Sequence, residues 1–329
     1  MTKVDVGGEI RTVQRRRMRL PVPLAWIVIV PFAAWAVIRL AGLERGMLMF
    51  QLISGTPYVA AGSLFALLVA AASRSRAAMS AALATCALMA IIVLPRALPS
   101  APTATGPTLR ILTANLFYGQ GDARTVVDLV RRLRADILNV QELTPEAVQA
   151  LDAAGLGARL PYRHLEDAAG SSGSGIYSRH PLTRLPDFAP AGGHNMPRAA
   201  LTLPGGRTVE VVDVHTLAPV HHNIAGWLAD FSALPSVASS SATIRILAGD
   251  FNATLDHAAL RAVIGRGYVD AADATGNGLR TTWPADQRHP PLITIDHVLF
   301  DERASAVRTS THDVPGSDHR ALFTELRLP

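Results

Sequence analysis

The chain has 329 residues, of which 49% are hydrophobic and 17% are charged, and its net charge is +5 at pH 7. This composition excludes a disordered, highly charged protein. The charge is uneven: residues 1–106 contain 11 Lys and Arg against 3 Asp and Glu, whereas residues 107–329 contain 20 against 23. The C-terminal part is therefore slightly acidic, which argues against a broad basic surface for nucleic acid. A single cysteine excludes an intrachain disulfide.

Three uncharged apolar runs lie in the first hundred residues. They cover residues 20–38, 46–73 and 77–95 and are 19, 28 and 19 residues long. Because about 20 apolar residues cross a bilayer, each run predicts a transmembrane helix, within a membrane region at 20–96. A cleaved signal peptide is disfavoured because two further runs follow the first. Three buried helices of a soluble domain are disfavoured because such helices rarely lack charge over these lengths. Polar and helix-breaking residues at 51–57 predict a kink in the middle run.

Basic residues predict the orientation of this membrane region. Six Lys and Arg precede the first run and two lie between the second and third runs, whereas three lie at the opposite ends of the runs together with Glu44. Since cytoplasmic loops carry the excess of basic residues, we expect a cytoplasmic N-terminus at 1–19, three crossings of the plasma membrane and an extracytoplasmic C-terminal part. Pro, Ala and Thr at 97–107 predict a short semi-rigid linker. A domain at 108–329 follows it.

From residue 108 onward, apolar strands and amphipathic helices are both predicted. The strands are expected at 109–114, 137–140, 175–178, 199–203, 208–215, 244–248, 293–300 and 321–326. The helices are expected at 123–133 (with Asp122 as the N-cap), 145–151, 223–234 and 255–263. Several strands follow one another without a helix between them. This favours an α/β sandwich of two mixed sheets over a purely parallel, doubly wound sheet.

Polar residues stand at the ends of these apolar strands. They are Asn115, Glu142, His215, Asp250, Asn252, Asp296, Asp318 and His319. Alone, each is more often a turn or structural residue, but together at one rim they would form a site of oxygen ligands with acid and base groups beside it. Carboxylates favour Mg²⁺ or Mn²⁺ as the cofactor. Zinc is disfavoured because no cysteine lies outside the membrane region and no HExxH motif occurs.

The ordered motifs resemble a known superfamily. ILTAN, VQEL, SGIYSRHPL, VVDVHT, AGDFNA, IDHVLF and SDHRALF, within residues 108–329, resemble the endonuclease/exonuclease/phosphatase superfamily. This superfamily includes DNase I-like nucleases, abasic-site endonucleases, sphingomyelinases and inositol polyphosphate phosphatases. The resemblance implies a four-layer α/β/β/α sandwich and metal-dependent phosphoester hydrolysis. With three apolar runs ahead of the domain, the chain is also similar to the teicoplanin-resistance membrane proteins of actinobacterial glycopeptide-resistance clusters.

The resemblance also implies which residues hold the metal. By motif position, Glu142 is the main Mg²⁺ ligand, Asn115 lies beside it on the metal or a phosphate oxygen, and Asp318 completes the metal shell. Many relatives carry a second acidic residue just after the first-strand Asn, whereas Leu116 and Phe117 follow it here. We therefore expect one metal ion rather than two.

The same motif positions imply the catalytic residues. Asp250 would orient or deprotonate the attacking water, and Asn252 would donate a hydrogen bond to a phosphoryl oxygen. His319 would contact the phosphate, with Asp296 fixing its tautomer and raising its pKa. His215 would face the leaving group as a phosphate ligand or as the general acid.

These features together predict a membrane-anchored, Mg²⁺-dependent phosphohydrolase acting outside the cytoplasm. A tether raises the effective concentration of lipid-borne substrates, so a phospholipid head group or undecaprenyl phosphate or diphosphate is the expected target. Hydrolysis of a wall-precursor lipid would link the enzyme to glycopeptide resistance. A metal-dependent surface nuclease of the DNase I type is the alternative, disfavoured by the acidic domain. An inactive binding domain is a third alternative, disfavoured by the complete polar set. The sequence indicates no protein partner.

Overall fold

The computed structural model describes residues 20–186, 192–220, 222–237, 241–286 and 290–329. The segment 1–19, which we expect to be cytoplasmic, lies outside the described residues. The chain divides into two compact units. The helical unit comprises Met1–Ala36 and Val59–Ala90, and the sandwich unit comprises Val37–Tyr58 and Ile91–Pro329.

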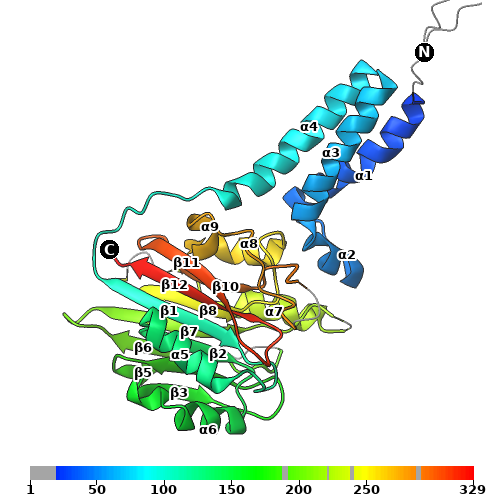
Figure 1. Cartoon of the computed structure of the whole chain (residues 1–329). Helices are drawn as coiled ribbons and strands as arrows, with labels where there is room; N and C mark the ends of the chain where they lie inside the picture. Colours follow the sequence, from blue (N-terminus) through cyan, green and yellow to red (C-terminus); the bar gives the residue numbers. More distant parts are fainter. Residues whose placement is uncertain (1–19, 187–191, 221, 238–240, 287–289) are drawn as a thin grey trace, which may run out of the picture. The chain divides into compact units, whose positions relative to one another are not determined.

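Three helices of the described chain are long and apolar enough to cross a membrane. They are α1 (Val22–Ala41), α3 (Thr56–Ser73) and α4 (Arg76–Val93), the last extended by the 3₁₀ turn η1 (Leu94–Ala97) (Figure 1). The packed interior of the helical unit is rich in alanine. Small residues at such positions let membrane helices approach closely. The three predicted apolar helices are thus confirmed as candidate spans.

The middle run differs from the prediction. It forms two helices, a separate α2 (Gly46–Ile53) and then α3. The chain turns at Ser54 and Gly55, and the Thr56 hydroxyl donates to the Ile53 carbonyl at 2.6 Å. Pro57 then falls in the first turn of α3, where a missing N–H costs nothing. The break lies within the residues where the kink is predicted, but it separates two helices, so α3 alone, with 18 residues, is the candidate span.

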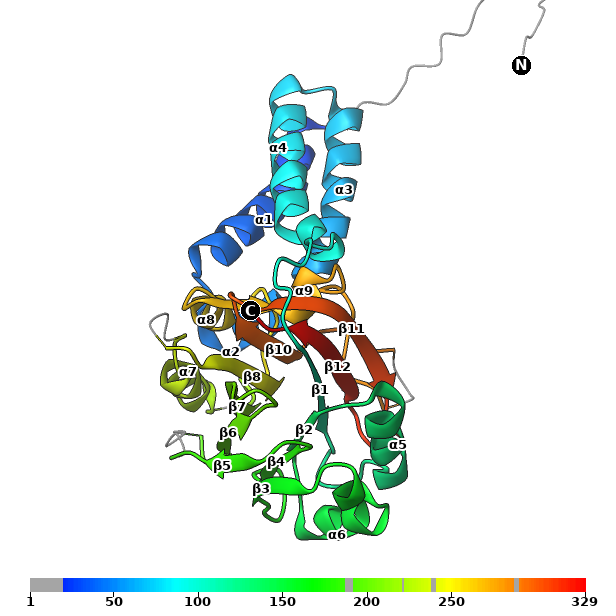
Figure 2. The same cartoon turned by 90° about the vertical axis from the view of Figure 1, so that its left-hand side faces the viewer.

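Two mixed sheets form the centre of the sandwich unit (Figures 1 and 2). Within the described residues, the first sheet has the order β11 (Ser305–Asp313), β12 (Arg320–Arg327), β1 (Thr108–Asn115), β2 (Ile137–Gln141), β4 (Ser174–Ser178), β3 (Tyr162–Glu166). The second has the order β5 (Leu182–Arg184), β6 (Arg198–Thr202), β7 (Thr208–His215), β8 (Ile244–Asp250), β10 (Asp296–Asp301), β9 (Tyr268–Asp270). The β1–β2 and β7–β8 pairs are parallel, and the other pairs are antiparallel.

Helices cover the outer face of each sheet. Beside the first sheet lie α5 (Ala123–Leu133), α6 (Pro145–Ala153) and the 3₁₀ turn η2 (Leu156–Ala158); beside the second lie α7 (Ile224–Ala233) and α8 (Ala258–Ile264), while the short α9 (Ala271–Ala274) contacts β11. A further apolar core lies between the sheets. The predicted four-layer α/β/β/α sandwich is therefore confirmed. Helix α5 has the predicted bounds, since the Asp122 side chain accepts from the Thr125 N–H at 2.7 Å as an N-cap.

Buried polar groups join the two sheets near the strand ends. The Asn139 amide donates to the carbonyls of Val212 and Ala248 in the opposite sheet, at 3.1 and 2.9 Å. Gln141 and the Gly175 N–H both donate to the buried Asp213 carboxylate. Since unpaired buried polar groups are costly, these bonds fix the relative position of the sheets at the rim where the candidate site lies.

The segment 97–107, which we expect to be a linker, lies along the sandwich. The N–H groups of Ser100, Thr103 and Gly106 donate to Ala274, Ser305 and Leu328 of the sandwich, at 2.8, 3.0 and 2.9 Å. Hydrogen bonds at three points along eleven residues hold this segment in one path.

Candidate active site

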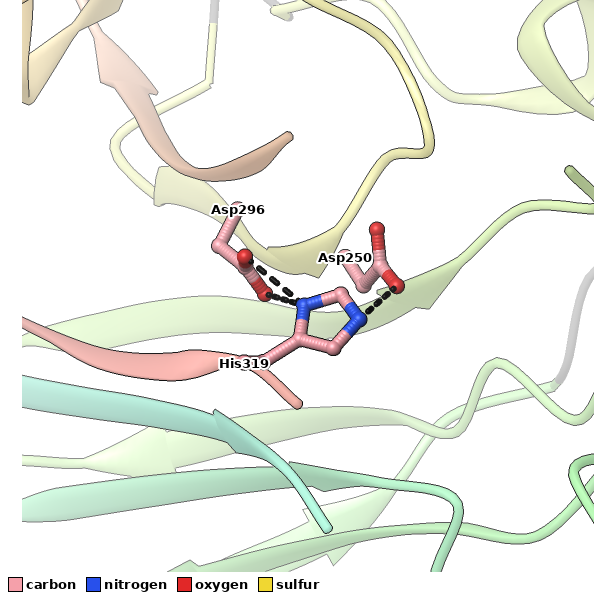
Figure 3. Close-up of side chains that lie close together, drawn as sticks. All are labelled: Asp250, Asp296 and His319. Carbon is pink, nitrogen blue, oxygen red and sulfur yellow. Dashed lines mark hydrogen bonds and ion pairs between the residues drawn. The ribbon is translucent and has the colours of Figure 1, made fainter. Parts of the chain in front are cut away.

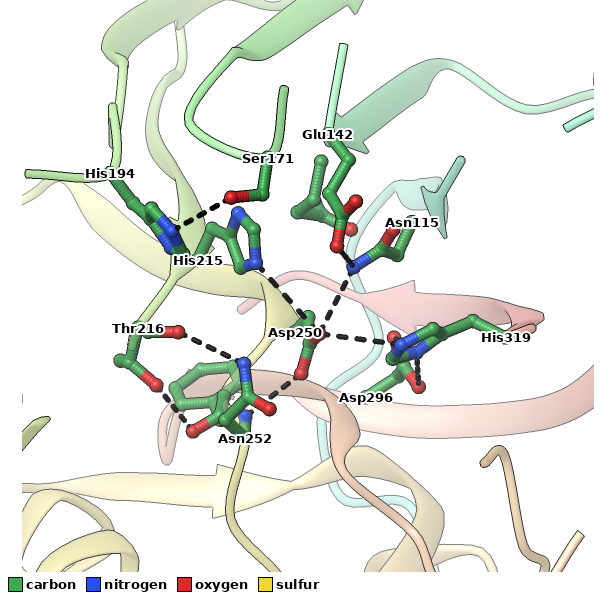
Figure 4. Close-up of polar contacts among 12 residues, drawn as sticks. Asn115, Glu142, Ser171, His194, His215, Thr216, Asp250, Asn252, Asp296 and His319 are labelled. Carbon is green, nitrogen blue, oxygen red and sulfur yellow. Dashed lines mark hydrogen bonds and ion pairs between the residues drawn. The ribbon is translucent and has the colours of Figure 1, made fainter. Parts of the chain in front are cut away.

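The predicted polar residues converge at one rim of the sandwich (Figure 4). Strand register explains why: Asp250, at the end of β8, pairs with His215 of β7 and with Asp296 of β10. Six of the predicted residues line one cavity of about 700 Å³, namely Glu142, His215, Asp250, Asn252, Asp318 and His319. Asn115 and Asp296 lie directly behind them, each hydrogen-bonded to a residue of that group.

Asp250, Asp296 and His319 form a buried ion-paired group (Figure 3). The Asp296 carboxylate lies 2.9 Å from His319 Nδ1, and Asp250 Oδ2 lies 3.6 Å from Nε2. Burial lowers the pKa of His319, but the two carboxylates outweigh it and raise this pKa above its usual range. Burial raises the pKa of Asp250, an effect that the His319 charge opposes only in part. The predicted pairing of Asp296 with His319 is present.

Asn115 bridges the carboxylates at the centre of the site. Its amide nitrogen donates to Glu142 Oε1 at 3.2 Å and to Asp250 Oδ2 at 3.1 Å, while its oxygen accepts from the Phe117 N–H at 2.9 Å. The other Glu142 oxygen accepts from the Tyr118 N–H at 2.7 Å. Burial nevertheless raises the pKa of Glu142. Asn115 thus presents nitrogen, not oxygen, to the two carboxylates.

Only one carboxylate oxygen of Asp318 accepts a hydrogen bond from the described residues. Its Oδ2 accepts from the Trp283 indole N–H at 3.1 Å, so this tryptophan positions a carboxylate as well as lining the cavity. Its Oδ1 is buried, accepts no hydrogen bond from the described residues and lies 3.8 Å from His319 Nε2 in an ion pair. The negative charge of Asp318 also contributes to the raised pKa of Glu142. A buried carboxylate oxygen without a hydrogen bond, beside a second carboxylate, fits a bound divalent cation.

The Asp250, Asp296 and His319 group could also hold a metal by distance alone, since one ligand atom from each lies within 4.8 Å of the others. However, both ring nitrogens of His319 face carboxylates, and its raised pKa favours the protonated imidazole. A protonated imidazole has no lone pair for a metal. The residues present therefore fit a cation better beside Glu142 and Asp318.

A second histidine that the sequence did not indicate lies against His215. The rings of His194 and His215 stack with their centroids 4.1 Å apart, and His194 Nε2 lies 3.4 Å from the Ser171 hydroxyl. His215 Nε2 is 4.0 Å from Asp250 Oδ2. Burial lowers the pKa of both histidines, and each neighbouring imidazole lowers that of His215 further. His215 is therefore a neutral group on the side of the cavity opposite His319.

The backbone around the site is held in uncommon conformations. Phe117, Tyr118, Glu142 and Asn252 all have positive φ angles between 46° and 54°. The Asn252 N–H donates to Asp250 Oδ1 at 2.8 Å and its side-chain amide donates to the Thr216 carbonyl at 2.9 Å. Positive φ costs free energy in non-glycine residues and is retained mainly where surrounding contacts enforce it. These turns aim the carboxylate and amide groups into the cavity.

The cavity is lined by acidic and apolar residues. Glu142, Asp250 and Asp318 line it, and none of its described lining residues is Lys or Arg. A phosphate group would be repelled by these carboxylates unless a bound cation offset their charge. The apolar lining includes Phe50 of α2, Leu217, Trp283, Ile293 and Ile295.

A comparison with models of protein families identifies the family of this chain. The model of the endonuclease/exonuclease/phosphatase family matches residues 112–319. The chain belongs to this family. No curated protein sequence matches the chain. The family match confirms the expected class of enzyme, a metal-dependent phosphoester hydrolase, while the identity of the metal is a matter for proposal.

Solved structures share the fold of the sandwich unit at low sequence identity. A humanised D. rerio TDP2 is 18% identical, with 67% of this chain and 98% of that chain covered and a TM-score of 0.52. A mannosyl-6-phosphatase of Bacteroides thetaiotaomicron is 16% identical, with 66% and 99% covered and a TM-score of 0.51. A family protein of Bacteroides vulgatus is 16% identical, with 68% and 100% covered and a TM-score of 0.53.

Proposed function

We propose that the protein is a membrane-anchored, Mg²⁺-dependent phosphohydrolase that cleaves lipid-borne phosphoesters at the extracytoplasmic face of the plasma membrane. The observation that carries this proposal is the attachment of the site to the ends of two candidate spans. Both ends, residues 37–41 of α1 and 91–93 of α4, belong to the same compact unit as the catalytic cavity.

Asp256 makes this attachment. Its carboxylate is buried and pairs with Arg96 just after α4, at 2.5 and 2.9 Å, and with Arg39 at the end of α1, at 3.1 Å. Asp256 lies six residues after Asp250, on the loop that follows β8. The loop that follows Asp250 is therefore paired with the chain segments at the ends of two candidate spans, which favours a substrate held in the membrane.

The chemistry follows from the placement of the polar groups. A bound divalent cation would stabilise negative charge on the phosphoryl oxygens, and Glu142 and Asp318 would hold it. Asp250, with its raised pKa, is suited to accept a proton from the attacking water. Protonated His319 would bind a phosphoryl oxygen. Asn115 positions the two carboxylates that its nitrogen contacts.

The remaining groups face the other side of the cavity. The second N–H of the Asn252 amide can donate to a phosphoryl oxygen, because only one is needed for Thr216. His215 is neutral, so we assign it hydrogen bonding to the phosphate or leaving group rather than proton donation as an imidazolium. Asp296 keeps His319 charged and oriented.

A substrate screen on the full chain in vesicles tests this proposal. Wild type and Glu142→Gln would be compared on undecaprenyl phosphate, undecaprenyl diphosphate, phosphatidylglycerol and plasmid DNA, with Mg²⁺ or Mn²⁺. We expect Mg²⁺-dependent hydrolysis of a lipid phosphoester that Glu142→Gln abolishes. Plasmid nicking without lipid hydrolysis would establish the surface nuclease instead, and inactivity on the whole panel would favour a binding domain.

The orientation needs a separate measurement. A C-terminal tag on the full chain would be probed with an impermeant reagent on intact cells. Labelling is expected, because three crossings from a cytoplasmic N-terminus leave the domain outside. A tag reachable only after lysis would overturn the extracytoplasmic assignment. If the lipid substrate is a wall precursor, loss of activity would also change glycopeptide susceptibility.

A further inference from the structure

We infer that α2 is an interfacial helix that forms the binding wall for the hydrocarbon chain of the lipid substrate. This inference rests on the proposed function and names the part of the chain that selects a membrane-borne substrate over a soluble one. Helix α2 has three faces: one is bound to the sandwich, one lines the cavity and one is open.

The bound face fixes α2 on the catalytic domain. Phe50 is 6% exposed and packs edge-on against Trp227 of α7, with ring centroids 5.3 Å apart. The Phe50 carbonyl accepts from His257 Nε2 at 2.8 Å, and His257 Nδ1 accepts from the Thr254 N–H at 2.9 Å. Just before α2, the buried Glu44 carboxylate accepts from the Ala258 N–H at the start of α8. The helix thus contacts the end of the loop that follows Asp250.

The cavity face of α2 lines the same cavity as the catalytic groups. Phe50, Gln51 and Ser54 line the same cavity as Glu142 and His319. The neighbouring wall consists of Leu217, Ala218, Pro219, Val220, Ile293 and Ile295. A phosphate at the carboxylate side would therefore have an apolar surface, not a charged one, next to its leaving group.

The open face is apolar and adjoins the membrane by its position in the chain. Leu48 and Leu52, one turn apart, are 67% and 46% exposed. Four residues separate α2 from the end of α1, and two separate it from the start of α3. Residues 46–73 contain no charged side chain. A short uncharged helix joined this closely to two candidate spans has to lie at the membrane surface, where its exposed leucines are covered by lipid.

A single hydrocarbon chain would account for both the cavity face and the open face of α2. A hydrocarbon chain lying in the outer part of the bilayer would contact Leu48 and Leu52 and lead past Gln51 and Ser54 to a phosphate in the cavity. A protein partner on the open face would account for the leucines but not for the apolar wall inside the cavity. We therefore assign the surface to the substrate lipid.

The test compares two substrates in one preparation. The double variant Leu48→Gln/Leu52→Gln of the full chain in phosphatidylcholine vesicles would be assayed on undecaprenyl phosphate and on water-soluble p-nitrophenyl phosphate, or on the corresponding diesters if wild type prefers them. We expect kcat/KM for the lipid to fall roughly tenfold, because the contacts of two leucine side chains with the hydrocarbon chain would be lost. Activity on the soluble substrate should stay within about twofold of wild type, since neither leucine lines the cavity.

Two controls keep the result specific. Leu48→Met/Leu52→Met should retain lipid hydrolysis, and Tyr162→Gln, an exposed aromatic on β3 that does not line the cavity, should change neither activity. Equal loss on both substrates would show that α2 is only structural, and unchanged lipid hydrolysis would remove its assigned role. A loss seen only in cells and not in purified vesicles would point to a protein on this face. If wild type hydrolyses no lipid at all, the proposed function fails instead.

Discussion

The two sides of the catalytic cavity differ in origin and in how firmly they are held. The polar side comes from strand ends of both sheets, and hydrogen bonds among its groups hold it together; Asn115 alone contacts Glu142, Asp250 and the Phe117 N–H. The apolar side includes α2, which lies between two candidate spans and is bound mainly through Phe50. Under the proposed function, bond cleavage and substrate selection would be carried by different parts of the chain, so a substitution on one side should leave the other working.

The largest expected effect comes from the polar side. Asp250→Asn removes the charge that faces His319 and the group suited to accept a proton from water. We expect kcat to fall about 10²–10⁴-fold, the usual contribution of a general base, on soluble and lipid substrates alike. Steady-state assays on both substrates would measure it, with the thermal unfolding midpoint as a check on folding. A loss confined to the lipid substrate would contradict the separation of the two sides.

The strand-end residues of the polar side could be predicted from the sequence because local patterns determine them. An apolar strand that ends in Asp250 or Glu142 has its position fixed by hydrophobic periodicity, and parallel neighbours bring such ends to one rim. Helix α5 has the predicted bounds because Asp122 supplies the capping group within its own turn. Even so, the register pairing of Asp250 with Asp296 became visible only in the structure.

The features that could not be predicted depend on tertiary contacts. Helices α2 and α3 are both apolar and uncharged, and tertiary contacts such as the packing of Phe50 on Trp227 place the first of them in the sandwich unit. His194 follows no predicted strand, so nothing local indicates that the fold stacks it on His215. Strand β11 has mostly polar, partly exposed residues and therefore lacks the apolar pattern that marked its neighbours.

The next largest effect tests the connection between the spans and the active-site loop. Asp256→Asn leaves Arg39 and Arg96 without their buried carboxylate, and breaking such a pair costs about 3–5 kcal/mol. We expect a lower free energy of unfolding in detergent micelles, and lipid hydrolysis more impaired than soluble hydrolysis. Asp152→Asn removes an exposed pair with Arg163 and should cost at most about 1 kcal/mol. Equal free energies of unfolding for the two variants would show that the ion pairs of Asp256 do not stabilise the fold.

A smaller effect is expected where the polar and apolar sides meet. Trp283→Phe keeps an aromatic ring in the wall but removes the N–H that Asp318 accepts. Because groups that orient a metal ligand change metal affinity about 10–100-fold, the Mg²⁺ concentration for half-maximal activity should rise within that range. Activity at saturating Mg²⁺ should recover most of its wild-type value. A Mg²⁺ titration measures both quantities. An unchanged midpoint would show that Trp283 does not position a metal ligand.

The smallest effect is expected from an ion-pair group outside the cavity. Glu210 on β7 pairs with Arg198 and Arg245, at 2.5 and 2.8 Å. Burial raises the pKa of Glu210, but the hydrogen bonds of the two arginines outweigh it and lower this pKa below 4.5. Its charged form therefore stabilises the fold above the pKa of the unfolded chain, and this stabilisation is lost as the pH falls through the lowered folded-state pKa.

Glu210→Gln should accordingly cost about 1 kcal/mol of unfolding free energy at neutral pH. Denaturant unfolding of wild type and variant over a pH series would show the difference between them shrinking as the pH falls below about 4.5. Activity on both substrates should be unchanged at neutral pH, because Glu210 does not line the cavity. A loss of activity without a loss of stability would mean that a change at Glu210 alters the position of Asp250 through β7 and β8. The geometry of the polar side would then depend on residues outside the cavity as well as on its own hydrogen bonds.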